Sequence, residues 1–397
     1  MTLRHAASLL ILLAAVPLLS SCWDKTEMNQ LALVSMVGVD SDPDKGTIKV
    51  YYQIINPLSG SSTIKAPGGE QAPVYTYEME AKSFGEIRSQ IYKKLPRKLF
   101  IAHYKVLLVS EQTARQSIRD YANFIEMQPN GRSSIPMLVV EGPLEPVMKT
   151  FTPLEKVPSD SIRARLDQLI QNSLLSERNI RITDVIERMQ QSRSIVLPIL
   201  TRIDDARSAK SGEVASNIDA EQGSFIISGG AVFQNYRMTG RLNDEQMIWY
   251  HLLAGDKGLH VRLFEVEGKP VSLEFHLNQI KRKASWQSGR PVIRIFMDIE
   301  LSTAYASEYI PKSRNEVDKM EQEVSQAIER ECYKLYELSR EREWDLLGIK
   351  YLLRRKTPDH PNIEDAEKNA KVSIQVNARL KKMGSLQKPY DETGGGS

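Results

Sequence analysis

The spacing of apolar residues along this chain predicts two kinds of element. Short runs that alternate or are continuously apolar, bounded by turn residues, predict strands. They cover residues 31–39, 48–55, 74–81, 106–109, 135–140, 195–203, 224–234, 238–242, 259–267, 270–280, 291–304 and 371–382. Apolar residues three or four apart predict amphipathic helices. These cover residues 83–95, 111–127, 159–175, 183–192, 243–254, 313–343 and 344–354.

The order of these elements predicts the fold class. Helices and strands alternate between residues 83 and 140, which is typical of mixed α/β packing. Hairpins dominate further along the chain, and the strands at 291–304 and 371–382 favour antiparallel pairing. We therefore expect an α+β protein of several domains with largely antiparallel sheets. A length of 397 residues corresponds to two or three domains of ordinary size.

Polar segments without a period divide the chain. Residues 204–222 are polar and aperiodic, so we predict a linker there. This linker separates an N-terminal region, residues 22–203, which we expect to hold two α+β subdomains, from a C-terminal domain, residues 223–385. Residues 386–397 end in a glycine-rich run and are predicted to be a disordered tail.

The amino terminus carries a targeting signal. A short basic start with Arg4 precedes the uncharged apolar run 6–19, which is shorter than the ~20 residues that a membrane-spanning helix needs. This pattern predicts a cleaved signal peptide, residues 1–21. The end of the run, Leu19-Ser20-Ser21-Cys22, resembles the bacterial lipobox, where the cysteine thiol receives a diacylglyceryl group. Cys22 is thus the predicted lipidation site, and the alternative is a plain signal peptide with an incidental cysteine.

Composition excludes several classes of protein. The chain is 41% hydrophobic and 26% charged, as ordinary globular proteins are, which excludes disorder or a polytopic membrane protein as a description of the whole. A net charge of +3 does not call for a nucleic-acid partner. One local basic cluster compensates a helix C-terminus or contacts anionic headgroups, and it comprises Lys350, Arg354, Arg355 and Lys356.

Catalytic signatures are absent from the sequence. We find no phosphate-binding loop, no Gly-x-Ser-x-Gly, no His-Glu-x-x-His and no Cys-x-x-Cys, and the six histidines form no local pair. Cys332 lies among glutamates at a helical position, which favours a packed helix residue over a nucleophile. We predict no catalytic residue, no metal and no cofactor, while a metal site assembled from distant residues stays open.

Three blocks of sequence resemble one family. The first comprises Cys22-Trp23-Asp24-Lys25-Thr26-Glu27-Met28-Asn29 and a following apolar strand that ends Gly38-Val39-Asp40. The second comprises Gly230-Ala231-Val232-Phe233 and Gly240-Arg241-Leu242-Asn243-Asp244-Glu245. The third is Asp345-Leu346-Leu347-Gly348-Ile349, although His360-Pro361 stands where the family often has a tryptophan after the proline. Together they resemble the Ger(x)C family, the lipoprotein C subunits of spore germinant receptors.

The resemblance implies a three-domain α+β lipoprotein on the outer face of the spore inner (cytoplasmic) membrane. It implies action without catalysis, beside membrane-embedded A and B subunits, to trigger germination by nutrients. Trp23, Asp24 and Glu27 are then candidates for contact with the membrane or the partner subunits; alternatively they form a tether in which Asp24 caps a short helix. A second hypothesis is a lipid-anchored extracytoplasmic solute-binding protein, and an envelope hydrolase is a third without motif support.

Overall fold

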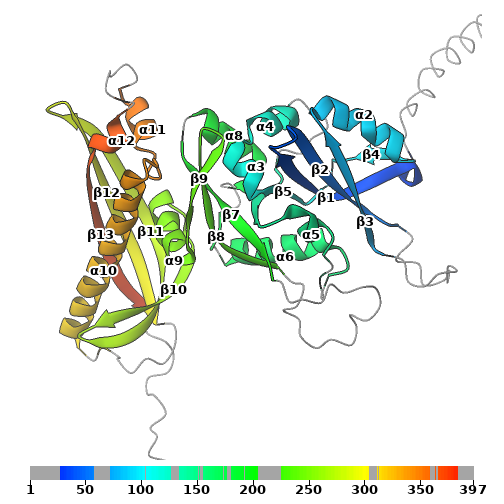
Figure 1. Cartoon of the computed structure of the whole chain (residues 1–397). Coiled ribbons are helices and arrows are strands. Elements are labelled where there is room, and N and C mark those ends of the chain that lie inside the picture. The colour runs from blue at the N-terminus through cyan, green and yellow to red at the C-terminus, as the bar shows by residue number, and fades with distance from the viewer. Residues whose placement is uncertain are drawn as a thin grey trace, which may run out of the picture.

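The computed structural model describes residues 27–57, 72–102, 104–126, 134–150, 152, 155–172, 174–176, 180–191, 193–203, 225–303, 311, 313–357, 363 and 365–382. The strands within these ranges form a nine-stranded sheet and a four-stranded sheet (Figure 1). The predicted signal peptide, the linker 204–222 and the tail 386–397 lie outside the described residues.

The nine-stranded sheet has the order β3-β2-β1-β5-β6-β7-β8-β9, and β4 pairs with the start of β1. Its strands are β1 (Leu31–Asp42), β2 (Thr47–Ile55), β3 (Val74–Ala81), β4 (Lys98–Phe100), β5 (Val106–Ser110), β6 (Met137–Glu141), β7 (Ile195–Arg202), β8 (Phe225–Gln234) and β9 (Arg237–Leu242). Strands β1, β5, β6 and β7 run parallel, whereas both ends of the sheet are antiparallel. Parallel neighbours need crossover connections, and helices supply them here.

Helices connect or flank these strands. They are α2 (Phe84–Lys94), α3 (Glu111–Gln116), α4 (Arg119–Glu126), α5 (Leu144–Met148), α6 (Pro158–Gln171) and α8 (Ile182–Gln190). The single helix predicted over 111–127 is wrong. The backbone of Ser117 is extended and ends α3, and the Ser117 hydroxyl accepts the Arg119 N–H at 3.1 Å, which starts the chain into α4.

The four-stranded sheet has the order β10-β11-β12-β13 and is covered on one face by a long helix (Figure 1). Its strands are β10 (Leu259–Val266), β11 (Lys269–Gln287), β12 (Arg290–Thr303) and β13 (Lys371–Lys382). The helices of this part are α9 (Asp244–Ala254), α10 (Arg314–Glu341), α11 (Ile349–Arg354) and α12 (Ala366–Asn369). Met320, Val324 and Ile328 on α10 are fully buried, as their spacing predicts.

Two details of this sheet differ from the prediction. Strands β12 and β13 pair in parallel, with Ile295 opposite Ile374, so the expected antiparallel pairing is wrong. The intervening helices α10 to α12 return the chain to the end of the sheet where β12 began. Strand β11 also extends to Gln287, beyond the predicted end at residue 280. A bulge between Leu277 and Gln279 shifts the alternation of buried and exposed positions, so the alternating pattern is interrupted near that point.

The predicted fold class is nevertheless confirmed. Six of the eleven strand pairings between described strands are antiparallel, and helices pack on both sheets. The molecule is therefore α+β. The centre of the larger sheet is parallel, and the local sequence pattern did not distinguish these parallel strands from the antiparallel hairpins.

Strands β7 and β8 contribute to two hydrophobic cores. Ile195 and Leu197 on one face of β7 pack into the core of the larger sheet, whereas Val196 on the other face packs with α9 and the four-stranded sheet. On β8, Phe233 packs into the core of the larger sheet, whereas Val232 packs into the core of the four-stranded sheet. Alternation of side chains along a strand thus places this part of the sheet between two cores.

Candidate membrane and partner surfaces

The beginning of the folded body carries one of the predicted contact residues. Glu27 is exposed, its carbonyl accepts the Gln30 N–H at 3.0 Å, and its carboxylate accepts the Asn29 amide at 3.0 Å. These bonds close the 3₁₀ helix Met28–Gln30, which leads directly into β1. Glu27 therefore shapes the entry to the fold. Cys22, Trp23 and Asp24 lie outside the described residues, so their predicted roles stay predictions.

The described residues offer little for catalysis. No cluster of three His, Cys, Asp or Glu side chains suited to a metal occurs among them. Cys332 is a fully buried residue of α10, as its spacing predicts, and burial raises the pKa of its thiol. A thiol that stays protonated and has no access to solvent is neither a nucleophile nor a metal ligand.

A buried histidine cluster lies between α9 and β10. The His251 Nδ1 atom is 2.8 Å from a carboxylate oxygen of Asp256. Nearby His260 is 2% exposed, its ring is 5.5 Å from that of Phe275, and neither ring nitrogen has a hydrogen-bond partner. Burial, with a smaller contribution from nearby His251, lowers the pKa of His260 to about 4, and Asp256 opposes the shift. A buried imidazole that stays neutral contributes to packing between α9 and the four-stranded sheet.

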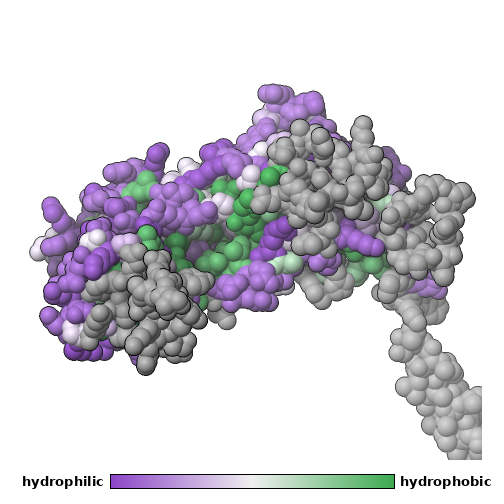
Figure 2. All heavy atoms as spheres, turned by 90° about the horizontal axis from the view of Figure 1, so that it is seen from below, coloured by the Kyte–Doolittle hydropathy of each residue, from purple (hydrophilic) through white to green (hydrophobic). Residues whose placement is uncertain are grey.

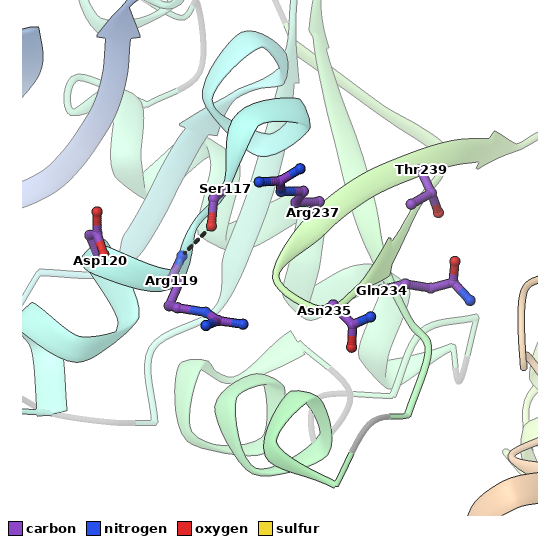
Figure 3. A pocket seen from close by; sticks show the side chains of 7 residues that line it. All are labelled: Ser117, Arg119, Asp120, Gln234, Asn235, Arg237 and Thr239. Carbon is purple, nitrogen blue, oxygen red and sulfur yellow. Dashed lines mark hydrogen bonds between the residues drawn. The ribbon is translucent and has the colours of Figure 1, made fainter. Parts of the chain in front are cut away.

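An open polar hollow of about 520 Å³ lies between the α3–α4 connection and the β8–β9 hairpin (Figure 3). The Ile118 N–H donates to the Tyr236 carbonyl at 2.9 Å, and the Arg119 guanidinium lies 4.9 Å from the centre of the Tyr236 ring. These contacts hold the hairpin against the helices. The hollow is lined by Ser117, Arg119, Asp120, Gln234, Asn235, Arg237 and Thr239. The hollow is open and polar, unlike the mostly apolar, enclosed sites that bury a small molecule.

A row of exposed apolar side chains follows β10, an edge strand of its sheet. Leu259, Val261 and Leu263 are 42%, 51% and 64% exposed and alternate with residues that face the core. Figure 2 shows hydrophobic side chains gathered near the middle of the face it presents. Exposed apolar rows on free strand edges are features of protein contact surfaces. The sequence already indicated this row, since apolar residues occupy both the inward-facing and the outward-facing positions of the strand.

The second and third family blocks meet at one place in the structure. A Cβ atom on Gly240 of β9 would overlap the ring of Trp344, which precedes the third block. The Asp345 N–H donates to the Ser194 hydroxyl at 3.0 Å, and the Gln234 amide donates to the Glu343 carbonyl at 2.6 Å. These blocks therefore join β7–β9 to the α10–α11 connection, and their residue types follow from close packing.

Two family models account for most of the chain. "Spore germination protein N-terminal domain" matches residues 24–202, and "Spore germination B3/GerAC like, C-terminal" matches residues 228–384. The chain belongs to the Ger(x)C family of spore germination proteins. The resemblance drawn from the three sequence blocks is thereby confirmed.

Relatives and a solved structure agree with this membership. Spore germination protein KC of Bacillus subtilis (strain 168) is 24% identical over 367 residues, which cover 90% of this chain and 89% of that protein. The putative spore germination protein YfkR of the same organism is 23% identical over 233 residues, or 58% of this chain and 56% of that protein. The crystal structure of the GerBC protein matches with a TM-score of 0.54 at 17% identity, covering 87% of this chain and 97% of that one, and so shows the same fold.

The Ger(x)C protein has no helix, among the residues described, that is long and apolar enough to cross a bilayer. The predicted basic cluster near α11 is largely engaged within the protein. Lys350 pairs with Glu367 at 2.9 Å, Lys356 donates to the Ala284 carbonyl at 3.0 Å, and Arg355 lies over the Tyr351 ring. The structure thus favours a structural role for this cluster over contact with lipid headgroups.

Proposed function

We propose that this protein is the non-catalytic, lipid-anchored C subunit of a spore germinant receptor. It is held by acylated Cys22 on the outer face of the spore inner membrane. It acts through contacts with the membrane-embedded A and B subunits and is required for germination triggered by nutrients. Trp23, Asp24 and Glu27 follow the anchor and lie where the membrane and these subunits meet.

One observation carries the proposal. The two family matches cover residues 24–202 and 228–384, which together are most of the chain after Cys22. The lipobox Leu19-Ser20-Ser21-Cys22 stands immediately before that match. Two acyl chains give stable membrane attachment where a single chain binds reversibly. The exposed apolar row on β10 supports the view that the protein acts through contacts with other proteins.

The test replaces the proposed anchor residue. Cys22→Ala prevents acylation, so we expect the protein to leave the spore membrane fraction and the spores to lose most of their response to nutrient germinants. Incorporation of labelled fatty acid, membrane fractionation and loss of spore refractility measure the three consequences.

Cys332→Ala is the matched control, because it removes the other cysteine and keeps the lipobox. This variant should retain label, membrane association and germination. A Cys22→Ala protein that stays in the membrane and supports full germination would contradict the proposal. Germination by a nutrient-independent route should be unchanged in every strain, which separates a receptor defect from a general defect in the spores.

The solute-binding alternative is tested on the same protein without its acyl group. Calorimetric titration with amino acids and sugars should give no heat of specific binding if the chain works by protein contacts. Saturable binding of one of these solutes, abolished by a substitution in a hollow such as Arg119→Ala, would favour the alternative.

A further inference from the structure

A dense basic patch lies at the end of helix α2 and in the turn to β4. Residues 88–98 contain five cationic side chains and no carboxylate. The 88–98 patch comprises Arg88, Tyr92, Lys93, Lys94, Arg97 and Lys98, all of them exposed. Tyr92 is 67% exposed, the most of any large apolar or aromatic side chain among the described residues.

These cations are not neutralised within the described part of the chain. Lys93, Arg97 and Lys98 have no ion pair there, and Lys94 donates to a neutral group, the Glu78 carbonyl, at 3.0 Å. The helix dipole accounts for cations in the last turn of α2, yet Arg97 and Lys98 follow the helix end. The basic cluster near α11 differs from this patch, because Lys350 and Lys356 have hydrogen-bond acceptors inside the protein.

The patch lies beside the place where the chain enters the fold. Strand β4 pairs with β1 so that Lys98 is opposite Leu31, the first residue of β1. Only eight residues lie between Cys22 and Leu31, so the anchor lies within about 30 Å of this pair even if the tether is fully extended. Figure 1 shows α2 and β4 at the end of the molecule opposite the four-stranded sheet.

We propose that the 88–98 patch docks the protein on the anionic lipid surface of the membrane that holds its anchor. This inference rests on the proposed lipidation of Cys22 for its geometry. Charge complementarity selects acidic headgroups, and Tyr92 supplies an amphipathic ring of the kind that favours the membrane interface. The short tether lets the cations reach the lipid surface, whose field extends only about a Debye length, roughly 8 Å in physiological salt.

Docking of this end fixes how the rest of the molecule stands. The four-stranded sheet, with the exposed row on β10, then projects away from the lipid surface. The acyl chains hold the protein at the membrane, and the patch sets its orientation.

The test uses the mature chain, residues 22–397, carrying Cys22→Ala so that no acyl group contributes. We expect it to sediment with vesicles of phosphatidylglycerol and phosphatidylcholine, and not with phosphatidylcholine alone, and to be released by high salt. The combined change Lys93→Gln, Arg97→Gln and Lys98→Gln should lower this binding at least about tenfold.

Three exposed cations of the four-stranded sheet provide a matched control. Lys281→Gln, Lys283→Gln and Arg294→Gln remove two lysines and one arginine from β11 and β12 and should leave vesicle binding within about twofold of the parent. Absence of binding to anionic vesicles, equal losses in the two triple variants, or salt-independent binding to phosphatidylcholine would each overturn the proposal. Circular dichroism confirms that each variant is folded.

A second readout reports which end meets the lipid. An environment-sensitive dye attached to Tyr92→Cys should shift to shorter wavelength on anionic vesicles, whereas the same dye on Leu263→Cys, a position of similar exposure, should not. The reverse pattern would contradict the orientation. The protein used in the vesicle experiments carries no acyl group, so these experiments test the 88–98 patch alone. The proposed anchor is tested separately, by fractionating spores that carry Cys22→Ala.

Discussion

His260 shows how one buried side chain sets the pH dependence of stability. Its ring packs against Phe275, which in turn contacts Phe264, and it lacks hydrogen-bond partners, so the protonated form would lose its hydration without compensation. Burial therefore lowers the pKa of His260 to about 4 in the folded protein. In the unfolded chain the imidazole has its ordinary pKa of about 6.5.

We expect the free energy of unfolding to fall as the pH decreases from about 6.5 towards 4. In this window the unfolded chain binds a proton at His260 and the folded chain does not, which costs about 2 kcal/mol at about pH 5. His260→Leu should remove this component and make urea unfolding midpoints at neutral and acidic pH more alike. His276→Gln is the control, since His276 is partly exposed and should leave the fall intact. An unchanged pH dependence in His260→Leu would contradict the assignment.

At the scale of elements, Asp345 explains why α11 starts where it does. Its carboxylate accepts the N–H groups of Ile349 at 2.6 Å and Lys350 at 3.0 Å, which have no partner within the helix. The side chain is buried, and burial raises the pKa of Asp345 while these N–H groups oppose the rise. A helix over 344–354 was therefore predicted too long, because residues 345–348 form its capping turn.

Asp345→Ala should lower the free energy of unfolding by about 2 kcal/mol, because it removes the cap and leaves two inward N–H groups unpaired. Asp345→Asn keeps one acceptor oxygen and should cost about half as much. Asp365→Ala is the control: Asp365 also precedes a short helix, but it is exposed and its side chain makes no capping bond. Equal effects of the two alanine variants in urea unfolding would contradict the capping role.

Local pattern predicted the elements better than their partners. The strands at 74–81 and 371–382 were predicted at their observed ends, the second because its apolar residues alternate from Val372 to Leu380. The direction in which β13 pairs was wrong, because alternation along a strand is the same for parallel and antiparallel neighbours. The break at Ser117 was also missed, since the apolar spacing continues across it. Of the predicted contact residues, Glu27 lies on the surface, as expected. The position of the 88–98 patch beside the start of β1 depends on the pairing of β4 with β1, which no local pattern reveals.

At the scale of the whole molecule, the two cores are joined through shared strands. Side chains of β7 and β8 enter both, and the junction adds the Asp345–Ser194 bond and the stacking of Arg193 on the Tyr351 ring at 4.5 Å. Loss of one core leaves one face of β7 and β8 exposed to water, which weakens the other core. The two family domains should therefore unfold together, and the nine-stranded sheet should be mechanically coupled to the four-stranded sheet.

This coupling can be measured because the tryptophans are unevenly placed. Trp249, Trp286 and Trp344 all belong to the second core or pack against it, so in a Trp23→Phe background fluorescence reports that core alone. Leu138→Ala empties a fully buried position in the first core, at a cost of about 3 kcal/mol. We expect it to lower the urea midpoint seen by tryptophan fluorescence as much as the midpoint seen by circular dichroism.

The exposed α4 residue Asn123 supplies the control, since Asn123→Ala should leave both midpoints nearly unchanged. If Leu138→Ala instead produced an early circular dichroism transition while the fluorescence midpoint stayed at the parent value, the cores would be independent. A common shift has a physical consequence for the whole molecule. An event that strains the nine-stranded sheet would then reach the exposed row on β10 through β7 and β8, because neither core can be loosened without the other.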